Sequence, residues 1–155
     1  MANPLIVFHA IVGFIGSLLF LLVAVELKRP IKTRDPAYAK IHIASMLGTL
    51  AILISWVMGG YYYVTIYGNE VKPAVKSIES WIHDIGMETK EHLFLFLPFL
   101  SMFVVSVIRV YARDLEKVRK VLMWTSLSIF LISVIIATEG FWITNAANTV
   151  LGVAR

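Results

Sequence analysis

The chain has 155 residues, of which 59% are hydrophobic, and its mean hydropathy of +0.80 is far above that of a soluble globular domain. Only 15% of the residues are charged, and they cluster between long apolar runs, which is the profile of a polytopic membrane protein. The absence of cysteine excludes disulfides, thiolate metal ligands, iron–sulfur clusters and covalent c-type haem attachment. The net charge of +4 is explained by basic loops and indicates no nucleic-acid partner.

Four apolar segments each have about the 20 residues that a helix needs to cross a bilayer. They cover about residues 5–27, 41–66, 91–111 and 121–145. Charge and proline end the first at Lys28-Arg29-Pro30, and Pro98 is expected to kink the third. The sequence therefore predicts an all-α integral membrane protein, with residues 1–155 forming a single four-helix transmembrane bundle.

Lysine and arginine are unevenly distributed about these segments. Connections 28–40 and 109–120 hold five each, and only four lie on the opposite side. The positive-inside rule therefore places both connections in the cytoplasm and both termini outside. The start of the chain lacks a basic region, so the first segment is expected to be an uncleaved helix. We expect a prokaryotic inner or plasma membrane.

The connection 67–90 is the longest, and we expect it on the outer side. Apolar residues recur within it at helical spacing, namely Val75, Ile78, Trp81, Ile82 and Ile85. This spacing predicts an amphipathic helix that lies on the outer surface of the membrane.

Glu139 interrupts the apolar run from Leu127 to Ile143. A charged side chain in hydrocarbon costs roughly 2.5 to 3.5 kcal/mol on insertion scales, and such residues usually line a site or a pathway. With a rise of about 1.5 Å per residue, Glu139 and His9 lie within ~10 Å of the outer ends of their helices. The apolar run after His92 is short, which draws His92 toward the same layer. The sequence therefore predicts a site near the outer leaflet.

A b-type haem requires two neutral imidazoles on different helices at one depth. His9 and His92 meet this requirement as ligands of the haem iron. Gly13 and Gly16 follow His9 on the same helical face and leave a slot for a flat macrocycle, although small residues at this spacing equally suit helix packing. The favoured interpretation is a membrane redox protein that binds one haem b, for electron transfer or small-molecule redox chemistry.

The carboxylates leave other interpretations open. Mixed histidine and glutamate ligands suit non-haem Fe, Cu, Mn or Zn, and the available set is His9, His92, Glu88, Glu91, Glu139 and His83. Beside a haem, Glu88 and Glu139 would instead be polar or proton-handling neighbours. A third alternative is a structural or assembly subunit, in which the cluster only satisfies polar groups between helices.

Three short motifs place histidines near the membrane boundaries: His9-Ala10, Lys40-Ile41-His42 and Glu91-His92-Leu93. This layout resembles small four-helix membrane b-type cytochromes, and also the four-helix membrane proteins that assist haem-copper oxidase assembly. Glu139 departs from the pattern of both groups, which favours a site that binds or activates something. A quinone or an external redox partner would fit such a function, in a homo-oligomer or a larger membrane complex. His42 is expected to be an interfacial residue.

Overall fold

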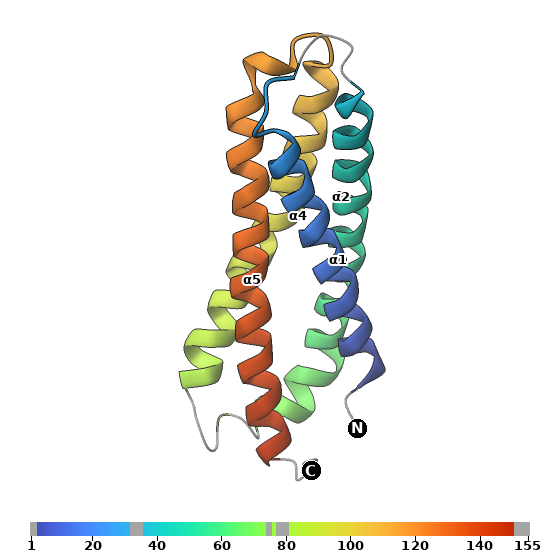
Figure 1. Ribbon diagram of the computed structural model, residues 1–155. Helices are drawn as coiled ribbons and strands as arrows, with labels where there is room; N and C mark the ends of the chain where they lie inside the picture. The colour runs from blue at the N-terminus through green and yellow to red at the C-terminus, as the bar shows by residue number, and fades with distance from the viewer. Residues whose placement is uncertain (1–2, 32–35, 74–75, 77–80, 151–155) are drawn as a thin grey trace.

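The computed structural model describes residues 3–31, 36–73, 76 and 81–150 (Figure 1). Four helical segments are long and apolar enough to cross a membrane: Pro4–Glu26, Ala37–Asn69, Asp84–Val110 and Arg119–Ala146. The described residues form no strand. The predicted all-helical class with four apolar segments is therefore confirmed.

The first two long helices begin at clear sequence signals. Helix α1 covers Pro4–Glu26 and follows Asn3, whose side chain accepts a hydrogen bond from the Leu5 amide at 2.9 Å. Asparagine at this position satisfies an otherwise unpaired amide, and proline at the first helical position has no amide to satisfy. Helix α2 covers Ala37–Tyr62 and continues directly into a π-helix, η1, over Tyr63–Val71.

The second half of the chain also starts with π-helical structure. The π-helix η2, Ile82–Met87, leads into α4, Glu88–Val110, which contains Pro98. A short 3-10 helix, η3 at Leu115–Lys117, then precedes α5, Arg119–Val150. Of the surface helix predicted over 75–85, residues 75 and 77–80 lie outside the described residues; residues 76 and 81 are helical, and Ile82 to Ile85 belong to η2, which continues into α4.

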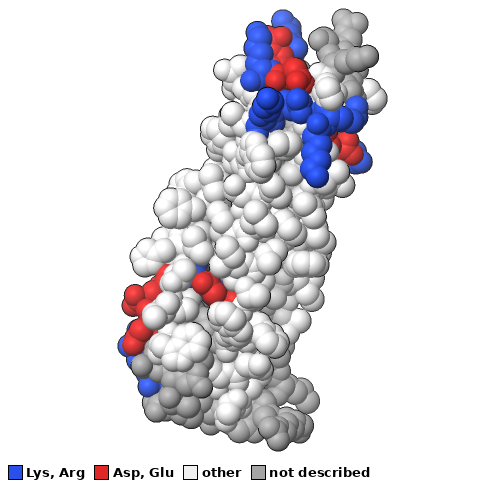
Figure 2. All heavy atoms as spheres, turned by 60° about the vertical axis from the view of Figure 1, so that its left-hand side comes forward, with Lys and Arg blue, Asp and Glu red and all other residues white. Residues whose placement is uncertain are grey.

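The four long helices form a bundle in which α1 and α4 each contact both α2 and α5, so α1 and α4 occupy opposite corners (Figure 1). The described chain begins and ends at one end of the bundle, which we call the termini end. The opposite end is called the basic end. Figure 2 shows Lys and Arg gathered there, and the residues are Lys28, Arg29, Lys40, Arg109, Arg113, Lys117, Arg119 and Lys120.

Small residues bring α1 and α2 close together. A Cβ added at Gly16 would lie 3.2 Å from the Gly48 carbonyl oxygen, and one added at Gly48 would lie 3.0 Å from the Phe20 ring. Gly13 also faces α2, since its added Cβ would lie 2.7 Å from Ser55 Oγ. Side chain and backbone of α2 therefore occupy the space beside both glycines of α1.

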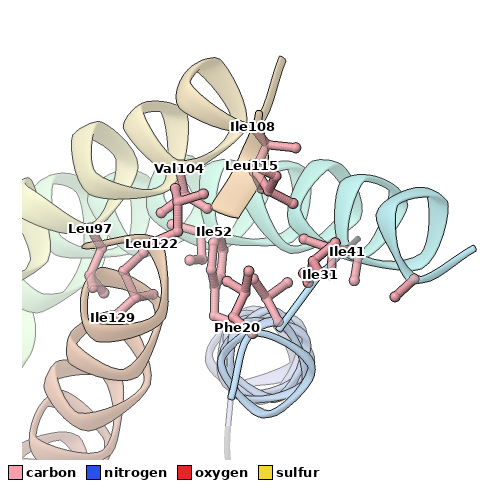
Figure 3. Packing of buried hydrophobic residues seen from close by; sticks show 14 of the residues in the cluster. Phe20, Ile31, Ile41, Ile52, Leu97, Val104, Ile108, Leu115, Leu122 and Ile129 are labelled. Carbon is pink, nitrogen blue, oxygen red and sulfur yellow. The ribbon is translucent and has the colours of Figure 1, made fainter. Parts of the chain in front are cut away.

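The apolar core runs from the middle of the bundle to the basic end (Figure 3). Each long helix contributes one buried stripe at three- and four-residue spacing, as the amphipathic pattern requires. The fully buried members are Phe20, Val23, Leu27, Ile41, Val104, Ile108, Leu122 and Ile129. Ile31 and Leu115, from the two connections, cover this core at the basic end.

A clasp of two charged residues holds these connections together. Arg119 Nη1 donates hydrogen bonds to the carbonyl oxygens of Leu27 at 2.8 Å and Lys28 at 3.2 Å. Glu116 accepts from the Ile31 amide at 3.1 Å and from Arg119 Nε at 2.8 Å. The Arg119 side chain and the Ile31 amide hold the pKa of Glu116 below its usual range.

Candidate functional site

The four buried stripes become polar as they approach the termini end. On α1 the stripe through Phe20 and Gly16 reaches His9, and on α2 it passes Ser55, which is 3% exposed. On α4, the stripe through Ser101 and Leu97 extends back by one heptad to Lys90. We call this set, completed by Glu91 and Glu139, the polar layer.

The polar layer lies between two apolar clusters. On α5, Glu139 follows Ile136, a member of the main core, and precedes Ile143 by about one turn. Ile143 packs with Tyr67, Val71 and Met87 in a second, smaller cluster. Glu139 is therefore held in apolar surroundings on both sides along the helix axis, although it is itself only partly buried.

His9 is held in one orientation by α2. Its Nδ1 lies 2.7 Å from the Ser55 carbonyl oxygen, which can only accept, so Nδ1 carries the proton. Ser55 Oγ donates back to the His9 carbonyl at 3.1 Å. The Phe94 ring meets the imidazole edge-on, with centroids 5.8 Å apart. A Cβ on Gly59 would lie 2.7 Å from His9 Cε1, so only glycine leaves room for this ring.

Lys90 is the cation of the polar layer. Its ammonium reaches toward α5, where a Cβ added to Gly140 would lie 3.2 Å from Nζ. It is electrostatically attracted to Glu139 and to Glu91, and it repels a proton on His9. Within the described residues, Lys90 forms no ion pair within 4.0 Å. The attraction is therefore looser than a hydrogen-bonded salt bridge.

Both carboxylates of the layer have one incompletely satisfied oxygen. Glu139 Oε2 and Glu91 Oε1 are buried and find no hydrogen-bond partner among the described residues. The Tyr63 hydroxyl lies near Glu91, and the Tyr63 ring stacks on Tyr67 with centroids 5.5 Å apart. Glu91 thus has a donor nearby, whereas no described donor reaches Glu139.

His92 lies on a different face of α4. It is exposed, and its Nδ1 is 2.6 Å from the Glu88 carbonyl oxygen one turn earlier. Phe96 and Phe99, on the same face, are 62% and 67% exposed. The structure therefore brings His9, Lys90 and Glu139 toward one another and leaves His92 outside this group.

Among the described side chains, the remaining candidate ligands do not gather into a group that could hold a metal ion. Glu88 is exposed, and the side chain of His83 is not among those described. Among the described residues, no group of three or more His, Asp or Glu side chains could hold a metal ion. At the other half of the bundle, His42 stacks on Tyr38 with ring centroids 5.7 Å apart, and its buried Nε2 has no described partner.

Lys90 is the site residue that the sequence analysis did not identify. Its signal is its position: counting back by four, three and four residues from Ser101 gives Leu97, Phe94 and Lys90, which is helical spacing. The same count places His92 about two residues out of phase. Reading which face a residue occupies, rather than only its depth, would have identified the lysine.

No protein-family model, curated protein or solved structure matches this chain. The fold and site define its class as a four-helix protein with membrane-length apolar helices and an interior polar layer at one end.

Proposed function

We propose that this chain is a membrane protein that takes up and releases protons at its termini end, with the Glu139 carboxyl group as the proton-binding group. One observation carries this proposal: Glu139 Oε2 is buried and has no hydrogen-bond partner among the described residues. The Glu139 side chain belongs to a long apolar helix and faces Lys90. Ionisable residues inside membrane spans are costly and mark proton relays and ion pathways.

The charge count of the polar layer favours one bound proton. Full ionisation gives one ammonium, on Lys90, and two carboxylates, on Glu91 and Glu139. This leaves one uncompensated negative charge in apolar surroundings, at a cost of roughly 2.5 to 3.5 kcal/mol on insertion scales. A single proton removes that charge and gives one buried oxygen a hydrogen to donate.

Glu139 is the better location for this proton. Glu91 has the Tyr63 hydroxyl beside it as a nearby donor. Glu139 Oε2 is buried and no described donor reaches it. The proton therefore stays on Glu139 until a base accepts it.

Titratable groups connect Glu139 with the surface of the termini end. Lys90 faces both Glu139 and Glu91, and Tyr63 lies near both Glu91 and the exposed Glu88. His9 faces Lys90 from α1. These groups supply donors and acceptors on the side from which we expect protons to enter.

Infrared spectroscopy of the full chain in lipid vesicles, without added cofactor, tests this proposal. We expect the carbonyl band of a protonated carboxyl group at neutral pH, shifted when the protein is moved into D2O. Glu139→Gln abolishes this band, whereas Glu88→Gln, on the exposed face, preserves it. Lys90→Met removes a nearby positive charge, so the band persists to higher pH. A band that is absent from the wild type, or unchanged in Glu139→Gln, overturns the proposal.

A second candidate is a b-type haem near the outer leaflet, and the orientation of His9 favours it. Histidine ligands usually donate their second ring N–H to a carbonyl, which fixes the tautomer and leaves the other nitrogen to bind metal. His9 Nδ1 has such a partner in Ser55, and His92 Nδ1 has one in Glu88. Nε2 of each ring is then free to bind the haem iron.

A haem held by both histidines requires the start of α4 to rotate. The face of α4 that is turned toward His9 carries Lys90, whereas His92 lies on a different face. The absorption spectrum of the purified chain tests this candidate. We expect a Soret band that is lost in His9→Ala and in His92→Ala and retained in His42→Ala, which changes a histidine at the other half of the bundle. A colourless wild type, purified after growth with ample haem, rules this candidate out. If the infrared band is also absent and metal analysis finds no bound Fe, Cu, Mn or Zn, the structural or assembly interpretation remains.

A further inference from the structure

Acidic side chains at the basic end already have basic partners. Glu26 pairs with Lys40 and, at 3.7 Å, with Arg29. Asp114 pairs with Lys117 at 3.0 Å, and Glu116 with Arg119 at 2.8 Å. The described acidic residues of this end are therefore engaged by the protein itself.

Four further basic side chains form no salt bridge within 4.0 Å with an acidic side chain among the described residues. They are exposed and come from both connections and their flanking helices: Lys28, Arg109, Arg113 and Lys120. Aromatic side chains lie close to them in sequence, with Tyr111 39% exposed and Trp124 60% exposed. Exposed tyrosine and tryptophan next to basic residues are typical of the headgroup region of a membrane.

The opposite end has a different charge balance. At the basic end eight described basic side chains stand against three acidic ones, whereas at the termini end three basic side chains stand against four acidic ones. Figure 2 shows Lys and Arg concentrated at one end of a largely uncharged molecular surface. The positive charge is thus localised where the apolar spans end.

We propose that Lys28, Arg109, Arg113 and Lys120 form a binding surface for the phosphate groups of anionic phospholipids. Charge complementarity and the position at the ends of the apolar helices both favour lipid over a soluble partner. Basic residues that flank membrane helices attract anionic headgroups, and each such residue near the surface raises the affinity roughly fivefold.

Competition between two lipids tests this surface. The full chain is purified in neutral detergent and mixed with equal amounts of phosphatidylglycerol and phosphatidylcholine, and bound lipid is counted by native mass spectrometry. We expect clear preference for phosphatidylglycerol, reduced about fivefold in Lys28→Gln, Arg113→Gln or Lys120→Gln. Lys72→Gln changes the net charge equally at the other end, so it serves as the matched control and leaves the preference within about twofold of the wild type.

Two results overturn the proposal. Equal binding of both lipids leaves the surface to another occupant, such as an acidic protein segment. An equal loss in Lys72→Gln and Arg113→Gln means that net charge alone attracts the lipid. The Glu139 infrared band is expected to be unchanged in the basic-end variants, so this test and the test of proton binding succeed or fail separately.

Discussion

The two ends of the bundle use charge in opposite ways. At the basic end the interior is closed by apolar residues such as Leu27 and Leu115, and the charged groups lie outside, where acids are paired. At the termini end the same helical stripes carry Lys90 and Glu139 into the interior. Stable bundles exclude unpaired charge from their interior, and proteins depart from this rule mainly at functional sites. The contrast therefore separates an end with an apolar interior and paired surface charges from an end whose interior holds charged groups.

The two ends also differ in the local structure and hydrogen bonding of their connections. Arg119 and Glu116 fix both connections of the basic end through hydrogen bonds to backbone atoms. The described part of the termini end has π-helical turns next to α2 and α4. Such turns are often found at functional sites, because they place a side chain differently from a regular helix. Substitutions at each end therefore test the two arrangements separately.

The largest effect is expected for Arg119→Ala at the basic end. The substitution leaves the Leu27 and Lys28 carbonyl oxygens without their donor and frees Glu116, at a cost of about 2 kcal/mol of unfolding free energy. Chemical denaturation in neutral detergent measures this loss. Lys120→Ala is the control: it is exposed one residue later and should change stability by less than ~0.5 kcal/mol. Equal stability of the two variants would show that the clasp does not hold this end together.

A smaller effect is expected at the termini end, from Gly59→Ala compared with Gly60→Ala. Both substitutions bring the same gain in helix propensity, but only the Gly59 Cβ would meet His9 Cε1, at 2.7 Å, whereas nothing lies within 4 Å at Gly60. Gly59→Ala should therefore be less stable than Gly60→Ala by about 1 kcal/mol. It should also move His9 away from the Ser55 carbonyl, which the nitrogen chemical shifts of the imidazole would report. Two variants of equal stability would contradict the close fit around His9.

These positions separate what a single sequence could predict from what it could not. The long apolar runs predicted the four spans because hydropathy and length decide them. Glu139 was found because a carboxylate inside such a run is conspicuous. Lys90 was missed because it stands at the end of its run, where depth alone does not reveal that the residue lies on the buried stripe.

Contacts between helices could not be predicted in this way. The pairing of His9 with Ser55, and the need for glycine at position 59, depend on which helices are neighbours and on their rotation. Hydropathy contains neither quantity. His92 illustrates the same limit, because its depth matched that of His9 while its face of α4 did not. Two residues at the same depth in the bundle are therefore less sure to meet than two residues that lie on the buried stripes of their helices.

The smallest effect is expected for Glu116→Gln, and it depends on pH. The folded protein lowers the pKa of Glu116 below its ordinary value of 4.5, mainly through Arg119. Ionised Glu116 therefore contributes stability that is fully present above pH ~4.5 and is lost as the pH falls through the lower, folded pKa. The Glu116→Gln variant lacks this contribution, so its stability should approach that of the wild type as the solution is acidified below pH ~4.5.

Unfolding curves collected from neutral pH down to about pH 3 would test this convergence. The matched comparison is the same substitution in an Arg119→Ala background, where the chief cause of the lowered pKa is absent. There the difference between glutamate and glutamine should change little with pH. A convergence that survives the loss of Arg119 would mean that the Ile31 amide and the charge of Lys120 are enough to hold Glu116 ionised, and that Arg119 is not the main cause of its lowered pKa.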